Sequence, residues 1–281
     1  MAGWRQRAIG QAFTANIDIA EVDYLILSVS GLDRLQIRLA QENLLAPWED
    51  ALEQLWQKRL RERIPVQYLT GLAYWRDLAL KVSPATLIPR PETELLVDLA
   101  IDFLTNYPNP VLADLGTGTG ALAIAIARAL PACTVYAVDL SSEALAIART
   151  NIETYGLEKQ IPLLQGAWFS PLPPDLQLDA LISNPPYIPT AMVGELAEEV
   201  RLHEPHLALD GGSDGLQAIR VLIQEAPRFL KPGGFWGIEV MAGQAGSVIS
   251  CLEKAGDYEH IGSVKDLAGI ARFVIASVSA R

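Results

Sequence analysis

The spacing of hydrophobic and polar residues follows two different patterns along the chain, and the pattern changes near residue 72. Before it, apolar residues recur every three to four positions, the spacing of helices with one buried face. The clearest case runs from Pro47 to Arg63, opened by acidic and closed by basic residues as the helix dipole favours. Shorter helices are predicted for residues 2–15, 19–30 and 32–40, with Gly31 as a C-terminal cap. Residues 1–72 therefore predict a small helical domain.

After residue 72 the pattern changes twice. Residues 73–90 alternate apolar and polar positions between turn residues, which predicts a β-hairpin linker between two domains. From residue 91 to 281, strands and helices then alternate, which predicts βαβ units and a mostly parallel sheet with helices on both faces. Predicted strands are residues 111–115, 133–140, 161–165, 179–184 and 234–240, and predicted helices include 142–155 and 216–230. Residues 258–264 and 271–278 predict an antiparallel pair at the sheet edge.

Composition excludes several classes of protein. Half of the residues are hydrophobic and 20% are charged, so the chain can bury a large core. The longest apolar run, Ala121 to Ala127, is far shorter than a membrane span, and no apolar stretch of a secretory signal follows the first residues. We therefore expect a cytoplasmic protein. Cys133 and Cys251 lack metal-ligand spacing and are expected to be reduced and structural, so we expect no metal site.

Net charge also limits the partners. The chain carries a formal charge of −11, of which residues 1–70 contribute −1 and residues 71–281 contribute −10. Such acidity argues against direct binding of nucleic acid, whose affinity comes from neutralised phosphates. It favours a partner with a basic surface at the C-terminal part.

A glycine-rich turn follows the strand at 111–115. Gly116, Thr117, Gly118, Thr119 and Gly120 lead into a helix, and Asp139 ends the next strand. This strand, glycine turn and helix is typical of a nucleotide-binding crossover, in which an acidic residue about twenty positions later accepts hydrogen bonds from ribose hydroxyls. A turn that serves only tight packing is the simpler alternative, and Asp139 at this spacing disfavours it.

The loop leaves the adenosine ligand open. Gly116, Gly118 and Ala121 fit the dinucleotide pattern G-x-G-x-x-G/A, so a nicotinamide cofactor remains possible. The pattern G-x-G-x-G with Asp114 two positions ahead resembles the S-adenosylmethionine loop of Rossmann-like methyltransferases instead. That cofactor needs no basic clamp for a phosphate.

A second motif, Asn184-Pro185-Pro186-Tyr187, ends the strand at 179–184, where open α/β sheets place ligands. An amide or aromatic amine nitrogen is a poor nucleophile, so an enzyme that methylates it must hold both N–H groups. The side-chain carbonyl of Asn184 and the backbone carbonyl of Pro185 supply two acceptors. Tyr187 offers a flat wall for a planar group. A rigid turn without chemistry is the alternative, and the preceding glycine loop and Asp139 favour the functional interpretation.

Seven segments together resemble the release factor glutamine methyltransferases, the PrmC/HemK family. They are residues 65–71, 88–94, 114–120, 137–139, 183–188, 204–216 and 264–269. The resemblance implies a seven-stranded Rossmann-like α/β methyltransferase domain preceded by a small all-helical domain that recognises the substrate. It implies methylation of the glutamine side-chain amide in the Gly-Gly-Gln motif of peptide chain release factors, with S-adenosyl-L-methionine as donor.

The resemblance also implies roles for single residues. By position, the cofactor contacts would be Gly116, Thr117, Gly118, Thr119, Gly120, Asp139, Trp168 and Asn184. The glutamine contacts would be Asn184, Pro185, Pro186 and Tyr187, and Arg90 and Thr93 would lie near the cofactor mouth. Two positions depart from the family pattern: Ala167 stands where an acidic residue often precedes the Trp-Phe pair, and Met241 stands where glycine is usual.

Other chemistry-bearing residues receive simpler interpretations. His203 and His206 have no third potential metal ligand nearby, so we expect them to lie in a loop beside the site and not to bind a metal. Glu195, Glu198 and Glu199 predict a solvated face, with a basic release-factor surface as a hypothetical partner. Trp4, Trp48, Trp56 and Trp75 predict core or interface packing. A methyltransferase of nucleic-acid amino groups and a cofactor-binding scaffold without turnover remain as alternative functions.

Overall fold

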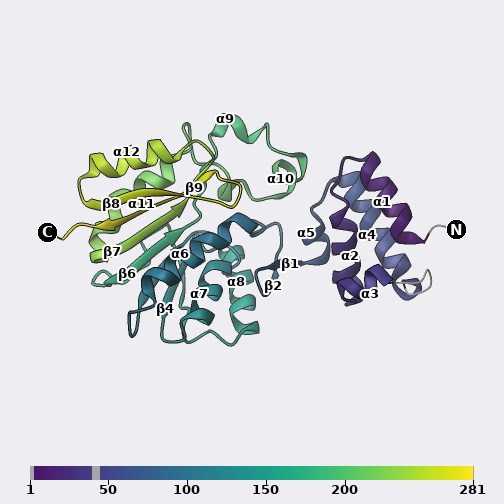
Figure 1. The fold of residues 1–281 in the computed structure, drawn as a ribbon, viewed down its shortest axis with the longest axis horizontal. Coiled ribbons are helices and arrows are strands. Elements are labelled where there is room, and N and C mark those ends of the chain that lie inside the picture. Colours follow the sequence, from purple (N-terminus) through teal and green to yellow (C-terminus); the bar gives the residue numbers. More distant parts are fainter. Residues whose placement is uncertain (1–2, 40–44, 281) are drawn as a thin grey trace. The chain divides into compact units, whose positions relative to one another are not determined.

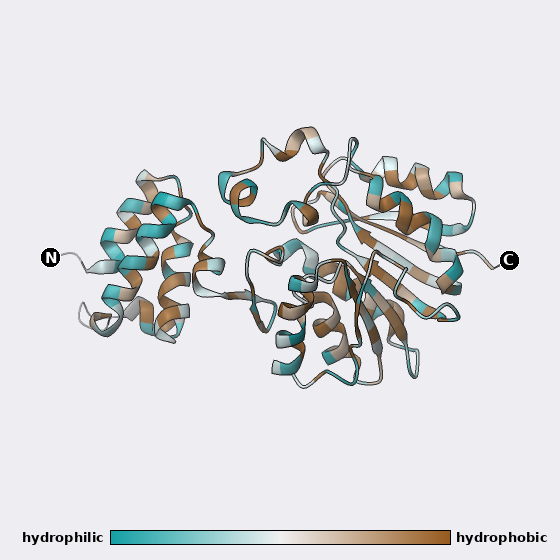
Figure 2. Cartoon of the chain, turned by 180° about the vertical axis from the view of Figure 1, so that it is seen from behind, coloured by the Kyte–Doolittle hydropathy of each residue, from teal (hydrophilic) through white to brown (hydrophobic). Residues whose placement is uncertain are grey.

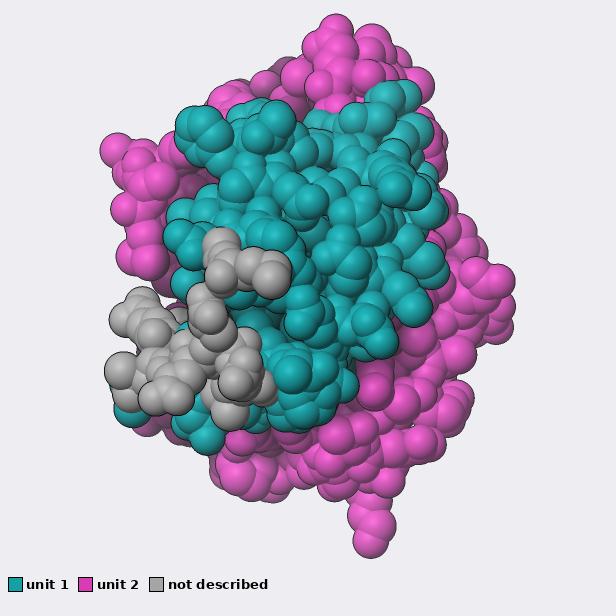
Figure 3. Space-filling model, turned by 90° about the vertical axis from the view of Figure 1, so that its right-hand side faces the viewer, with its two compact units in different colours: residues 1–72, 197–203 teal, residues 73–196, 204–281 magenta. Residues whose placement is uncertain are grey.

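The structure, a computed structural model, describes residues 3–39 and 45–280, which form two compact units (Figures 1 and 3). Unit 1 contains residues up to Leu72 together with Ala197–His203, and unit 2 contains Ala73–Leu196 and Glu204 onward. The helix ends predicted at Ala2 and Ala40 lie outside the described residues.

Unit 1 is helical. Its elements are α1 (Trp4–Thr14), α2 (Ala20–Ser30), α3 (Arg34–Leu39), η1 (Ala46–Trp48), α4 (Glu49–Glu62), α5 (Val66–Thr70) and α10 (Glu198–His203). Gly31 ends α2 in the left-handed conformation, as predicted for a C-terminal cap. Trp4 and Trp56 are buried in its core and Trp48 packs against it, so these tryptophans have the packing role that we predicted.

The inclusion of α10 in unit 1 corrects a boundary, since we expected residues 91–281 to form one domain. Ion pairs connect α10 to α4. Glu199 lies 3.0 Å from Arg59 and 2.5 Å from Arg63, and Arg59 is also held by Glu21 at 2.6 Å. The Arg59 side chain is only 3% exposed, so its charge requires carboxylate partners. Glu199 is therefore an internal ion-pair partner and does not belong to the solvated face that we predicted.

The elements of unit 2 begin with a two-stranded sheet of β1 (Leu72–Trp75) and β2 (Leu78–Lys81), so the hairpin is shorter than predicted. Then follow η2 (Pro91–Thr93), α6 (Glu94–Leu104), β3 (Val111–Leu115), α7 (Ala121–Ala129), β4 (Thr134–Asp139), α8 (Ser142–Thr154), β5 (Leu163–Gln165) and β6 (Leu178–Ser183). After them come α9 (Thr190–Val193), η3 (His206–Ala208), α11 (Gln217–Phe229), β7 (Leu230–Glu239), α12 (Ala245–Ala255), β8 (Tyr258–Lys265) and β9 (Ala271–Val278).

A seven-stranded sheet with the order β5-β4-β3-β6-β7-β9-β8 forms the centre of unit 2. The strands from β5 to β7 are parallel, whereas β9 runs antiparallel to both β7 and β8. This arrangement confirms the predicted Rossmann-like α/β fold with an antiparallel pair at its edge. Figure 1 shows α6, α7 and α8 on one face and α11 and α12 on the other.

The buried residues lie between the sheet and the helices on its two faces. All six residues of β6 are buried, and the strands of unit 2 are largely brown in Figure 2. One apolar cluster lies under α6 and α7, and a second lies under α11 and α12. The sequence did not predict α12, whose buried Ala245, Val248 and Leu252 cover the sheet beside β8. None of the described helices has both the length and the apolar character needed to cross a bilayer.

Candidate active site

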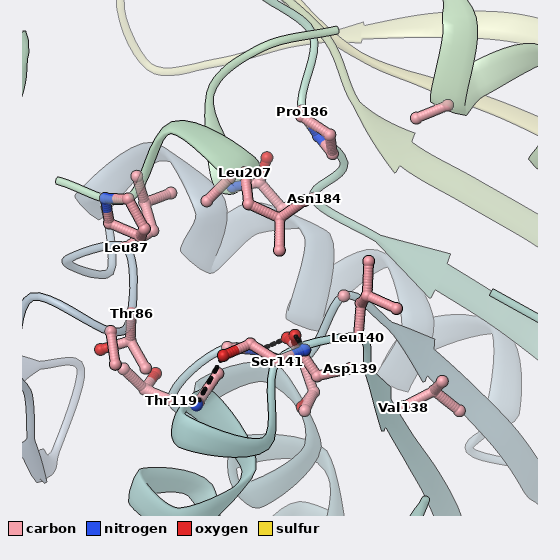
Figure 4. A pocket seen from close by; sticks show the side chains of 18 of the residues that line it. Thr86, Leu87, Thr119, Val138, Asp139, Leu140, Ser141, Asn184, Pro186 and Leu207 are labelled. Carbon is pink, nitrogen blue, oxygen red and sulfur yellow. Dashed lines mark hydrogen bonds between the residues drawn. The ribbon is translucent and has the colours of Figure 1, made fainter. Parts of the chain in front are cut away.

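A cavity of about 590 Å³ opens in unit 2 at the carboxyl ends of β3, β4 and β6. In Figure 4, Asn184, Pro186 and Leu207 lie on one side of it, Thr119, Asp139 and Ser141 on the opposite side, and Thr86 and Leu87 on a third. Most sequence-predicted residues line it: Arg90, Thr93, Gly116, Thr117, Gly118, Thr119, Asp139, Trp168, Asn184 and Pro186. Gly120, Pro185 and Tyr187 are not among the described lining residues.

The glycine loop folds tightly because its backbone turns through left-handed conformations. Gly116, Gly118 and Gly120 have φ of 79°, 55° and 81°, which residues with a Cβ rarely adopt. The amides of Gly116 and Thr117 both donate to the carbonyl of Val138, at 2.8 and 2.9 Å, so the loop is fixed to the end of β4. The ring of Trp168 lies 3.7 Å from the point where a Cβ would stand on Gly116.

Asp139 connects the glycine loop to the turn between β4 and α8. Its Oδ2 accepts from the amide of Gly118 at 2.8 Å, and its Oδ1 accepts from the amide of Ser141 at 2.9 Å. Burial raises the pKa of Asp139, and these backbone hydrogen bonds partly oppose that shift. A carboxylate has about four lone-pair sites, and the amides of Gly118, Ser141 and Leu140 interact with this one, so acceptor capacity remains for a hydroxyl donor of a ligand in the cavity.

Asp114 lies behind the loop and is fully buried. The hydroxyl of Thr117 donates to its Oδ2 at 2.6 Å, whereas its Oδ1 has no hydrogen-bond partner among the described residues. Burial raises the pKa of Asp114 to about 7, against the effect of the Thr117 hydrogen bond. This carboxyl group holds the loop through Thr117 and is partly protonated near neutral pH.

Asn184 is held by a hydroxyl group from a distant segment. Its Nδ2 donates to the Oγ1 of Thr93 at 3.3 Å, and the Thr93 hydroxyl donates to the Oε2 of Glu239 at 2.6 Å. Thr93 belongs to the segment at 88–94, which the sequence associates with the cavity only through the family resemblance. Glu239 is a site residue that sequence analysis missed, because nothing local marks the end of β7 as chemically important.

The Tyr187 hydroxyl donates to Oε1 of Glu239 at 3.0 Å. Burial and the adjacent carboxylate raise the Tyr187 pKa far above its ordinary value, so the phenol remains a donor. Its role as a flat wall for the substrate stays a prediction.

Two glycines allow a loop to press on the tetrapeptide backbone. A Cβ on Gly215 would stand 2.3 Å from the carbonyl oxygen of Tyr187, and a Cβ on Gly211 would stand 2.8 Å from that of Pro186. The Nε2 of Gln244 also donates to the Tyr187 carbonyl at 2.8 Å. Met241 accommodates this turn, since its amide donates to Gln244 Oε1 at 3.0 Å.

The two histidines belong to different units. His203 lies in unit 1, where its Nε2 is 2.8 Å from the carbonyl oxygen of Glu62. The prediction of a loop beside the site is therefore wrong for His203, which ends helix α10, whereas His206 begins η3 in unit 2 and lines the cavity. No group of three or more potential metal-ligating side chains occurs within the described parts of the chain.

Arg90 lines the cavity close to a buried carboxylate. It donates to Oε1 of Glu204 at 2.6 Å, and its carbonyl accepts from the Trp75 indole at 2.7 Å. Burial raises the Glu204 pKa, while Arg90 opposes the shift. Trp75 is buried in the sheet core, so core packing and cavity wall meet here. Cavity residues that the sequence did not predict include Pro84, Ala85, Thr86, Leu87, Leu140, Ser141, Leu207, Ala208 and Gln217.

Comparisons with known proteins agree with this geometry. The family described as "Methyltransferase small domain" matches residues 93–204, which include the glycine loop and the tetrapeptide. A methyltransferase structure from Pyrococcus furiosus has a TM-score of 0.53 at 19% identity, covering 83% of this chain and 100% of that chain, and shows the shared fold.

Two curated relatives carry the same name, "Release factor glutamine methyltransferase". The one from Gloeobacter violaceus is 53% identical over 99% of this chain and 97% of its own length. The one from Synechocystis is 42% identical over 98% of this chain and 95% of its own length. Because the likeness covers both units nearly from end to end, the chain belongs to the release factor glutamine methyltransferase family.

Proposed function

We propose that this protein transfers a methyl group from S-adenosyl-L-methionine to the side-chain amide nitrogen of the glutamine in the Gly-Gly-Gln motif of peptide chain release factors. One observation carries the proposal. A single cavity joins the Asp139 and glycine-loop wall to Asn184, so an adenosine-binding surface and an amide-reading side chain face the same space.

The residues present fit the cofactor. Asp139 keeps acceptor capacity for ribose hydroxyls, the left-handed backbone of Gly116 and Gly118 permits close approach, and Trp168 supplies an apolar face. Ala167 also lines the cavity and carries no carboxylate, so we expect adenine to be held by Trp168 and by backbone groups. When bound, S-adenosylmethionine supplies an electrophilic methyl group on a sulfonium.

The chain itself supplies orientation. Because Nδ2 of Asn184 donates to Thr93, its Oδ1 is the end left to accept an N–H of the glutamine amide. The backbone carbonyl of Pro185 is our proposed second acceptor, and Gly211 and Gly215 let the 211–215 loop brace this backbone. Two fixed acceptors orient the nitrogen and stabilise the positive charge that develops on it, which is catalysis by positioning and electrostatics.

We assign recognition of the release factor to unit 1. This helical unit has its own core of Trp4, Leu25, Leu52 and Trp56, and α10 is attached to it by the Glu199 ion pairs.

The net charge of −10 on residues 71–281 suits a basic protein partner and disfavours direct nucleic-acid binding. An enzyme with a translation factor as substrate works in the cytoplasm and needs no membrane contact.

The test is transfer of radiolabelled methyl from S-adenosylmethionine to a purified release factor. A factor whose Gly-Gly-Gln glutamine is replaced serves as the matched control, and bare DNA and RNA are tested in parallel. Label on the intact factor alone supports S-adenosylmethionine as the donor, the release factor as the acceptor and the Gly-Gly-Gln glutamine as the modified residue. Label on nucleic acid would show that nucleic acid is the substrate instead of the release factor. Absence of label on every candidate would favour a binding scaffold without turnover.

A further inference from the structure

Three hydrogen bonds connect the tetrapeptide to a carboxylate at the end of β7. Glu239 accepts at Oε2 from Thr93 and at Oε1 from Tyr187, at 2.6 and 3.0 Å, and Thr93 in turn accepts from Asn184 at 3.3 Å. Glu239 is fully buried and Thr93 is 5% exposed. The four side chains thus form one branched network in which Glu239 joins both branches.

The direction of each hydrogen bond follows from the chemistry of the carboxylate. An ionised carboxylate only accepts, so the hydroxyls of Thr93 and Tyr187 must both donate to it. With its one hydrogen committed to Glu239, Thr93 can only accept from Asn184. A flipped Asn184 amide would place Oδ1 against the lone pairs of Thr93, so the network selects one of the two amide orientations.

That orientation decides what the cavity offers to a substrate amide. With Nδ2 turned to Thr93, Asn184 presents an acceptor, which an N–H group needs. With the amide flipped, Asn184 would present a donor and repel the N–H. We propose that Glu239, acting through Thr93, is a positioning residue that fixes the Asn184 amide with its oxygen toward the substrate nitrogen. This inference rests on the proposed function, because it assumes that an amide nitrogen is the acceptor of the methyl group.

Stability alone does not explain a carboxylate at this place. The hydrogen-bond partners of Glu239 are both neutral hydroxyls, and burial raises its pKa, while these bonds and the more distant charge of Arg272 act in the opposite direction. A buried carboxylate without a directly bonded cation costs stability, and an apolar side chain of similar volume often fits such a site as well or better. Asp179 provides a contrast, since this buried carboxylate is paired with Lys231 at 2.6 Å and lies at the other end of the sheet strands.

The experiment compares Glu239→Leu, Thr93→Val, Thr93→Ser and the double variant E239L/T93V in the methyl-transfer assay with a release factor. Asp179→Asn is the control for loss of a buried carboxylate away from the cavity. For each protein, kcat, KM for the release factor, the Kd of S-adenosylmethionine and the melting temperature are measured.

We expect E239L and T93V each to lower kcat by about ten- to a hundredfold, since misplacement of an orienting group costs about this much. The cofactor Kd should change less than about threefold. T93S keeps the hydroxyl and should retain most activity, and E239L/T93V should be no slower than the slower single variant because both break one chain of contacts. D179N should lower the melting temperature but leave kcat near wild type.

The outcomes separate the two proposals. If the wild-type protein does not methylate the release factor, the proposed function is wrong. If it does, an E239L variant with wild-type kcat, or losses that multiply in the double variant, would overturn the positioning role. If E239L does not fold, the comparison of T93V with T93S still decides, because equal activity of these two variants contradicts any role of the hydroxyl.

Discussion

The side chain of Asn151 joins the glycine loop to the hairpin strand β2. Its Nδ2 donates to the carbonyl of Thr119 at 2.9 Å and to that of Lys81 at 3.0 Å, and its Oδ1 accepts from the amide of Lys81 at 2.7 Å. Asn151 is 1% exposed, so these backbone groups have little access to water as substitutes. A residue in the last turn of α8 thereby holds two elements beside the cavity.

Replacing Asn151 by Ala should therefore weaken both stability and cofactor binding. Buried partners left unpaired cost about 1–3 kcal/mol, and the freed Thr119 segment should raise the Kd of S-adenosylmethionine by about tenfold. Thermal unfolding and calorimetric titration measure the two effects. Thr150→Ala, an exposed position on the same helix whose hydroxyl bonds only within α8, is the control and should change neither quantity appreciably. An N151A variant with wild-type cofactor affinity would contradict the link.

Asn184→Ala removes the proposed acceptor for the substrate amide. We expect kcat to fall by about 10² or more, by analogy with deletion of one oxyanion-hole group, because the lost hydrogen bond strengthens as charge develops. Single-turnover methyl transfer measures this loss, and calorimetric titration of the cofactor should show a smaller effect. Unchanged turnover would refute the orienting mechanism.

Glu199 should matter for the stability of unit 1. Partial burial opposes its ionisation, but the amide at the helix start and Arg59 outweigh this and hold the pKa of Glu199 below its ordinary value. Glu199→Gln leaves the buried Arg59 with one carboxylate partner instead of two, so we expect a loss of about 1–3 kcal/mol in unfolding free energy. Denaturant unfolding measures it. Glu195→Gln, at an exposed position, is the control and should lie within about 0.5 kcal/mol of wild type.

Asp114 predicts a specific pH dependence of stability. Its pKa is raised to about 7 in the folded protein from its ordinary value of 3.8, so between these values the folded state binds more protons than the unfolded state. The contribution of Asp114 to the unfolding free energy therefore falls as pH rises through this window. Asp114→Asn removes this term, so the melting temperature of D114N minus that of wild type should increase from about pH 4 to about pH 7. If this difference in melting temperature stays constant across the range, Asp114 is not the group responsible for the pH dependence.

Several features of the fold were predictable because their signals are local. The glycine loop, Asp139 and the tetrapeptide each follow a strand that is recognisable from its own residues, and parallel strands bring their carboxyl ends to one edge. Helix α12 was missed because Gly246 and Ser247 in its first turn are weak helix formers, and the packing of Val248 and Leu252 on the sheet stabilises it.

Other features could only be seen once distant segments were brought together. Glu239 meets Thr93 across 146 positions, and Arg59 meets Glu199 across 140, and no local pattern marks these pairs. The sequence by itself determined the order of the strands along the chain and the chemical groups at the ends of β3, β4 and β6, since both depend on short-range spacing. The tertiary structure decided which way the Asn184 amide faces and to which unit α10 belongs, because hydrogen-bond direction and the pairing of buried charges are set by packing.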